Sequence, residues 1–367
     1  MAEKAIRLGG ESTAAAITQA VQELYPEHKF TEAEFARKDN AAEIAVDTNF
    51  AAQSFWKDVR IRFFRKKSAV LGLVMIMIIL LLAIFGPGMN AYTYSGQDLS
   101  QKNFAPRIPG IEQFGILDGS EKMSTTTGSK SVNAYVEKGK DDVYYWFGSD
   151  LYGRDIWTRT WEGARVSLII AVAAAVIDMV IGMSYGLISG YFGGRVDMVM
   201  QRFLEVANGI PRLVIVTLLL LVLQPGMVTI IFALMLTEWV GMSRIARAEM
   251  LKLKDQEFVL ASRTLGAGSF FIIFKEVLPN IIGPIITQVM FSIPTAIFTE
   301  AFLSFVGLGI PVPQCSLGSL ISELYNSFTT HPYQIIPPIV VMSLLMLSFN
   351  LVADGLREAL DPKMKSM

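Results

Sequence analysis

Cysteine and histidine are almost absent from this chain of 367 residues, which has one Cys and two His. A lone Cys315 excludes an internal disulfide, and His28 and His331 are too few to form a metal-binding cluster. The net charge of −1 argues against a nucleic-acid partner. The GxxxxGK[ST] phosphate loop and the HExxH zinc motif do not occur either. If ATP drives this protein, another chain must bind it.

Apolar residues are abundant instead, at 52% of the chain against 18% charged residues, with a mean hydropathy of +0.43. A membrane span needs about 20 mostly apolar residues, and the segments 68–85, 166–189, 207–223, 227–242, 281–308 and 335–353 qualify. Prolines 284, 294, 337 and 338 predict kinks in the last two. The sequence therefore predicts an all-α membrane protein with six transmembrane helices.

The distribution of Lys and Arg predicts the orientation. A basic run at 60–67 precedes the first span, and the segment 244–280 carries further Lys and Arg, whereas 224–226 and 309–334 have none. We therefore expect both termini in the cytoplasm. The expected order is a cytosolic extension (1–67), the first transmembrane helix (68–85), an extracellular segment (86–162), a five-helix core (163–358) with a cytosolic loop (244–280), and a cytosolic tail (359–367).

The N-terminal extension is not expected to be a signal peptide, because no apolar core precedes residue 68. At its end, Phe55, Trp56, Val59 and Phe63 share one helical face, with basic residues around them. This pattern predicts a helix that lies in the lipid headgroup layer. A basic topology signal with incidental aromatic residues would have the same pattern.

The segment 257–280, between the fourth and fifth spans, has the pattern of a short helix, a glycine turn and a second helix. Gly266 supplies the bend, and the second apolar run ends at Leu278 and Pro279. This arrangement resembles the EAA loop of ABC-importer permeases, the coupling helix that docks on the ATPase subunit. The family's usual glutamate position is occupied by Leu260, and the nearest acid is Glu257. The resemblance implies an ATPase-coupling surface that includes Glu257, Ala261, Ser262, Gly266, Leu278 and Pro279.

A second block, WFGSDLYGRDIWTRTWEGARVSL at 146–168, extends the resemblance. It is similar to the GTDxxGRDxxSRxxxGARxSL block of the C-type subunit of dipeptide and oligopeptide importers, with Ser149 and Thr158 in place of threonine and serine. The blocks GYFGGRVD (190–197), EAFLSFVGLG (300–309) and DGLREALDP (354–362) follow in family order. Trp157 and Trp161 suit a membrane-interface belt. The block either has a structural role or helps to receive substrate.

The resemblance implies a six-helix permease with the type I ABC-importer fold. Such a subunit would form half of a translocation pathway for oligopeptides or dipeptides and would alternate between inward-open and outward-open states. Its expected partners are a homologous B-type permease, two cytosolic ATPase subunits that bind ATP and Mg, an extracellular peptide-binding protein, and the bilayer of a bacterial cell membrane. The chain itself would bind no cofactor and catalyse no reaction.

Acidic residues inside the predicted spans are candidates for the translocation pathway, because a carboxylate in hydrocarbon costs about 2.5 to 3.5 kcal/mol and must face a cavity or a partner. These residues are Asp178, Glu238 and Glu300. Asp178 and Glu238 could attract the amino terminus of a peptide, or they could be paired within the bundle. For Glu300, we favour a structural hydrogen-bonding role.

Three alternatives remain open from the sequence. An ABC permease could carry a non-peptide cargo such as nickel. An ion-driven secondary transporter would also have buried acids, but it typically shows inverted repeats, and none is evident here. An intramembrane enzyme would need a nucleophile and a base, or a metal pair, for which two histidines are too few.

Overall fold

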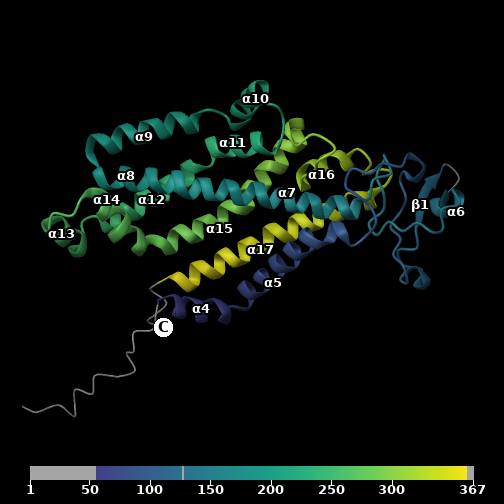
Figure 1. The fold of residues 1–367 in the computed structure, drawn as a ribbon, viewed down its shortest axis with the longest axis horizontal. Coiled ribbons are helices and arrows are strands. Elements are labelled where there is room, and N and C mark those ends of the chain that lie inside the picture. The colour runs from purple at the N-terminus through teal and green to yellow at the C-terminus, as the bar shows by residue number, and fades with distance from the viewer. Residues whose placement is uncertain (1–54, 126–127, 362–367) are drawn as a thin grey trace, which may run out of the picture. The chain divides into compact units, whose positions relative to one another are not determined.

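The computed structural model describes residues 55–125 and 128–361. Most of the expected N-terminal extension and the end of the C-terminal tail lie outside these residues. The described chain is mostly helical, as the apolar segments predict (Figure 1).

Five helical stretches in the described residues are long and apolar enough to cross a membrane. The first is α5 (Lys67–Phe85), which continues into the 3₁₀ turn η2 (Gly86–Gly88). The second joins α7 (Ile156–Ile177) to α8 (Met183–Phe192) through a π-helical turn, η5 (Asp178–Gly182). The third joins α11 (Met227–Thr237) to α12 (Trp239–Leu253).

The two remaining stretches contain the prolines. The fourth runs through α14 (Ser269–Phe271), the π-helical turn η6 (Ile272–Val277), α15 (Leu278–Leu303) and the π-helical turn η7 (Ser304–Leu308), and α15 holds Pro284 and Pro294 in its interior. The fifth is η8 (Pro332–Gln334) with α17 (Ile336–Leu360). Pro337 and Pro338 do not kink α17, contrary to expectation. They lie in its first turn, where a missing N–H leaves no hydrogen bond unmade.

The expected span 207–223 is not one helix. The chain forms α9 (Gly194–Gly209) and α10 (Arg212–Val222), which meet at an angle of 77°. Ile210 is extended at the break, and Pro211 has φ −58 and ψ 129, which is not helical either. Proline lacks an N–H group and disfavours a helical conformation in the residue before it, so Pro211 ends α9. The described chain has six spans if this bent pair counts as one.

Close packing holds the long helices together (Figure 1). Helix α5 packs on α17, α17 on α15, α15 on α7, and α12 on α8. Glycines let the backbones approach closely, as is usual between membrane helices. A Cβ on Gly72 would lie 2.8 Å from the Cβ of Leu351, and one on Gly186 would lie 2.1 Å from the carbonyl oxygen of Ser243.

Helix α4 (Phe55–Arg65) forms where the sequence predicts a helix at the headgroups. Its apolar face is only partly free, however, because Val59 and Phe63 are buried in the main hydrophobic cluster with residues of α5 and α17. A Cβ on Gly355 of α17 would lie 3.2 Å from the ring of Phe63. These two side chains therefore pack on protein rather than on lipid.

The segment between α5 and α7 carries the only strand pair of the described residues, the antiparallel strands β1 (Ser120–Thr125) and β2 (Gly128–Asn133), followed by α6 (Ala134–Glu137). It also contains the 3₁₀ turns η3 (Leu99–Gln101) and η4 (Glu112–Phe114). Its small core is aromatic: Phe104, Tyr135 and Tyr145 are buried, and Tyr92 stacks on Tyr145 with 4.5 Å between ring centroids. Figure 1 shows this segment at one end of the long helices and α13 (Glu257–Thr264) at the other.

Candidate functional site

A polar pocket of about 210 Å³ lies where four helical stretches lose their regularity. These irregularities are the π-helical turn η5, the break between α9 and α10, the junction of α11 and α12, and Pro294 inside α15. Irregular backbone at membrane depth is tolerated where it lines a cavity, and π-turns are common at functional sites. The lining residues are Asp178, Asn208, Arg212, Thr237, Glu238, Val240, Gly241, Arg244, Gln288, Phe291, Ser292 and Thr295.

Asp178 and Glu238, two of the three acids expected in the pathway, both line this pocket. The hydroxyl of Ser292 donates to Asp178 Oδ2 over 2.6 Å, while no described residue donates to the buried Oδ1. Glu238 is paired, because Arg212 Nη1 donates to its Oε1 over 2.6 Å. The two acids therefore differ: Glu238 has a cationic partner, and Asp178 has only a neutral hydroxyl.

The cationic part of the pocket was not predicted from the sequence. Arg212 lies inside an expected span, directly after Pro211, so its charge was an available signal. Arg244 was assigned to the basic loop, although it is part of α12 and lines the pocket. Arg244 forms no ion pair or hydrogen bond with the described residues. The pocket thus combines two acids with two arginines.

Glu300 does not line the pocket. It is 1% exposed and accepts hydrogen bonds from three serine hydroxyls: Ser167 of α7 at 3.3 Å, Ser304 of η7 at 2.7 Å and Ser316 at 2.5 Å. Ser316 is the N-cap of α16 (Leu317–Tyr325). One carboxylate therefore joins three elements, which agrees with the structural role that we favoured.

At the other end of the bundle, α13, a glycine turn and α14 form the expected pattern of helix, bend and helix. Gly266 has φ +83, in the left-handed region. The N–H groups of Gly266 and Ala267 donate to the carbonyls of Arg263 and Ser262, each over 3.0 Å. This pair of bonds is the Schellman motif, which requires a left-handed residue and favours glycine there.

The helix α13 is fixed to the bundle on one side and free on the other. Val259 is fully buried among Ile272, Ile273 and Val277, and the guanidinium of Arg263 lies 5.5 Å from the ring centroid of Tyr191. Large apolar side chains remain exposed on the free side, namely Phe258, Leu260, Leu265, Phe270 and Phe271. An exposed apolar patch of this kind is typical of a protein interface.

The six expected coupling residues have different environments. Glu257, Ala261, Gly266 and Pro279 are exposed. Ser262 and Leu278 are partly buried. Glu257 lies in the first turn of α13, and Pro279 lies in the first turn of α15.

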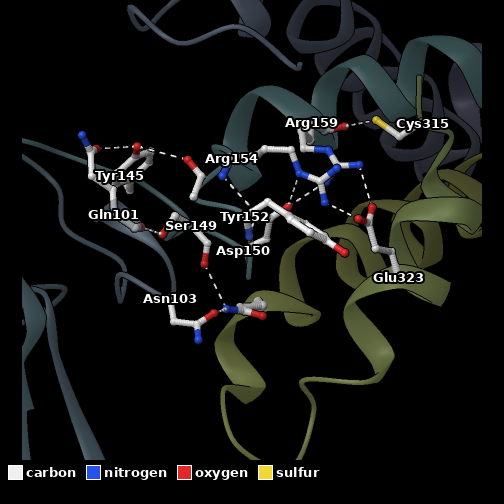
Figure 2. A network of polar contacts seen from close by, with 12 residues as sticks. Gln101, Asn103, Tyr145, Ser149, Asp150, Tyr152, Arg154, Arg159, Cys315 and Glu323 are labelled. Atoms are coloured by element: carbon white, nitrogen blue, oxygen red, sulfur yellow. Dashed lines mark hydrogen bonds and ion pairs between the residues drawn. The ribbon is translucent and has the colours of Figure 1, made fainter. Parts of the chain in front are cut away.

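The GSDxxGRD block forms a buried ionic network (Figure 2). Asp150 Oδ2 accepts from Arg154 Nε at 2.6 Å and from Arg159 Nη1 at 2.7 Å. Both arginines also form ion pairs with Glu323 of α16. Arg159 Nη2 donates to Glu323 Oε2 over 2.7 Å. Arg159 is fully buried. Without these acidic partners, its charge would have a large desolvation cost. The sequence did not identify Glu323, which lies in a segment without a recognised motif.

Other residues of this block also have a structural explanation. Asp155 is the N-cap of α7 and accepts from the Thr158 N–H at 2.8 Å. A Cβ on Gly153, which has φ +72, would lie 1.8 Å from the carbonyl oxygen of Asp98. Arg165 Nε donates to the carbonyl oxygen of Ala83 at 2.9 Å, which ties α7 to the end of α5. The geometry therefore favours a structural role for the block.

The block has three tryptophans, and the two that were expected in a membrane-interface belt, Trp157 and Trp161, both contact Gly86. Trp157 Nε1 donates to the carbonyl oxygen of Gly86 at 2.9 Å. Trp161 is 5% exposed, and a Cβ on Gly86 would lie 2.8 Å from its ring. Trp161 is a core residue, which corrects the expected aromatic belt.

Comparison with known protein families identifies the chain. The family described as binding-protein-dependent transport system inner membrane component matches residues 182–366, and the N-terminal TM domain of oligopeptide transport permease C matches residues 54–106. The chain belongs to this permease family. The resemblance to C-type ABC-importer permeases is thereby confirmed, as is the expected all-α membrane fold of a type I importer permease.

Named relatives of this permease cover most of its length. The oligopeptide transport system permease protein OppC of Bacillus subtilis (strain 168) is 42% identical over 85% of this chain and 91% of its own. The dipeptide transport system permease protein DppC of the same organism is 39% identical over 85% and 87%. A chain of the MetNI methionine ABC transporter, in an inward-facing conformation, covers 55% of this permease and 96% of its own length, with 16% identity and a TM-score of 0.47.

Proposed function

We propose that this permease forms half of the translocation pathway of an ATP-driven importer of oligopeptides or dipeptides. The observation that carries the proposal is the polar pocket at the convergence of four irregular helical stretches. Charged side chains at membrane depth are costly unless they face a cavity or a partner. Asp178, Glu238, Arg212 and Arg244 share such a cavity, and the named relatives are peptide permeases.

The proposed coupling surface is the free side of α13 and α14 with the Gly266 turn between them. Its exposed apolar residues would enter a groove of a cytosolic ATPase subunit, and the Schellman turn would keep the two short helices in fixed register. Two such subunits would bind ATP and Mg and carry out hydrolysis. A homologous B-type permease would supply the other half of the pathway, and an extracellular binding protein would deliver the peptide.

The proposed orientation places both termini and α13 in the cytoplasm, and the segment between α5 and α7 outside. It rests on the basic residues near α13 and before α5, and on the absence of Lys and Arg from 309–334.

Co-purification and reconstitution test this function. The tagged permease should isolate together with two ATPase subunits and a second permease. In proteoliposomes, this complex should take up radiolabelled peptide only when ATP and the loaded binding protein are both present. Uptake driven by a proton or sodium gradient without ATP would contradict the proposal. ATP-driven uptake of nickel in place of peptide would contradict the proposed peptide cargo but not the proposed permease role.

A further inference from the structure

The pocket holds two charges that the described chain leaves uncompensated. Asp178 is 4% exposed, and its Oδ1 receives no donor from the described residues. A buried acceptor without a donor is unusual and costs free energy, so it marks a place where another donor belongs. Arg244 is the uncompensated cation, since Arg212 is paired with Glu238. The four charged residues of the pocket sum to zero net charge.

The packing of η5 and α8 against α12 shows where Asp178 lies relative to Arg244 along the bundle. A Cβ on Gly182 would contact Trp239 and Met242, and one on Gly186 would contact Ser243 and Ala246. The helices η5–α8 and α12 therefore run side by side in the same direction. Asp178, one turn before Gly182, lies beside the start of α12, close to Glu238.

Arg244 lies further along α12 than Glu238, by about 9 Å at the rise of an α-helix. Two to three extended peptide residues span about this length. The pocket volume of about 210 Å³ accommodates a segment of that size but not a folded domain.

We propose that the pocket binds a peptide segment by both of its charged ends, with Asp178 accepting from the amino-terminal ammonium and Arg244 donating to a carboxylate. The inference rests on the proposed peptide-permease function and specifies the ligand as a zwitterion of two to three residues. Ser292 holds Asp178 in place, and the Arg212–Glu238 pair borders the site without offering a free charge. A singly charged segment would leave one of the two side chains uncompensated, and a neutral segment would leave both.

Three forms of one tripeptide test the proposal in the reconstituted complex: free at both ends, N-acetylated, and C-amidated. The binding protein is loaded to saturation with each form, and its affinity for each is measured separately, so that capture and translocation are distinguished. Asp178→Asn should lower the maximal uptake of the free peptide about tenfold and change that of the acetylated form little. Arg244→Gln should lower uptake of the free peptide similarly and change that of the amidated form little.

Matched controls are Glu205→Gln and Arg202→Gln, which remove one charge each from an exposed pair on α9 outside the pocket. Neither control should alter the order of the three forms. If Asp178→Asn does not assemble with the ATPase subunits, Asp178→Glu keeps the charge, displaces it by one methylene, and should reduce the preference for the free over the acetylated form. Equal effects of both pocket variants on all three forms would overturn the inference while leaving the permease function intact. Absence of peptide uptake by the wild-type complex would instead refute the function.

Discussion

Arg159 and Glu323 are separated by 164 positions, yet Arg159 Nη2 donates to Glu323 Oε2 over 2.7 Å. Burial alone would raise the pKa of Glu323, but the charges of Arg159 and Arg154 hold it below its ordinary value. The carboxylate of Glu323 therefore stays ionised at neutral pH and anchors α16 to the start of α7. This contact allows a test of what this end of the bundle contributes to stability.

We expect Glu323→Gln to destabilise the permease by about 2 kcal/mol at pH 7. The loss is smaller than the 3 to 5 kcal/mol typical of a fully buried pair, because part of the Glu323 side chain is exposed. Thermal unfolding of the purified complex, followed by tryptophan fluorescence, measures it. Glu205→Gln, from an exposed pair, should cost below about 1 kcal/mol.

The stability that Glu323 contributes should depend on pH. Because its pKa is lowered by folding, the contribution is complete above the unfolded value of about 4.3 and is lost as the pH falls through the folded value. The wild-type melting temperature should therefore fall more steeply below about pH 4.5 than that of Glu323→Gln. If the melting temperatures of the two proteins fall in parallel as the pH is lowered, Glu323 is not the source of this pH dependence.

Glu300→Ala should destabilise the subunit by on the order of 3 kcal/mol, because three serine hydroxyls lose their hydrogen-bond acceptor in a buried site. Transport of all peptides should fall in proportion to the amount of folded complex. Folded yield by size-exclusion chromatography and uptake per folded complex separate the two effects. A change in peptide preference at normal yield would place Glu300 in the pathway.

Gly266→Val should impair coupling. A branched side chain in the left-handed region costs about 1 kcal/mol or more and opposes the Schellman turn. We expect severely reduced uptake, and ATP hydrolysis that no longer responds to loaded binding protein. Gly268→Val is the control, because Gly268 has φ −68 and, like Gly266, has open space around it. Equal transport by both variants would show that the turn conformation does not matter for coupling.

Single cysteines test the orientation. Ser95 and Thr329 are exposed on the proposed outer side, and Ala261 is exposed on the proposed inner side. In a Cys315→Ser background, an impermeant maleimide applied to intact cells should label Ser95→Cys and Thr329→Cys but not Ala261→Cys. Labelling of Ala261→Cys alone would invert the orientation and exclude α13 as a cytosolic docking element.

Local patterns predicted local structure well. The glycine bend after α13 depends on residues within a few positions of one another, so Gly266 could be recognised from spacing. Pro211 was also a local signal, but the surrounding apolar run concealed it, and the break between α9 and α10 was missed. Val59 and Phe63 were placed on the correct helical face, but periodicity cannot distinguish lipid from a neighbouring helix as the contact of that face.

Long-range contacts were beyond the sequence. Nothing near Glu323 indicates two arginines as partners, and nothing near Asp178 indicates Arg244 as a neighbour in the same pocket. Such contacts depend on which helices pack together. Gly182 and Gly186 indicate that another helix approaches η5 and α8 closely. The residues around them do not indicate that this helix is α12.

The ionic network also has a consequence for the order in which the protein is made. Asp150, Arg154 and Arg159 leave the ribosome well before Glu323, by roughly 8 to 30 s at usual elongation rates. During that interval Asp150 is the only acid of this network that has been synthesised, and the contact of Arg154 and Arg159 with α16 cannot form. The network at residues 150–159 can therefore be completed only after residue 323 has been synthesised, and a nascent chain truncated before that residue would lack the contact that joins α7 to α16.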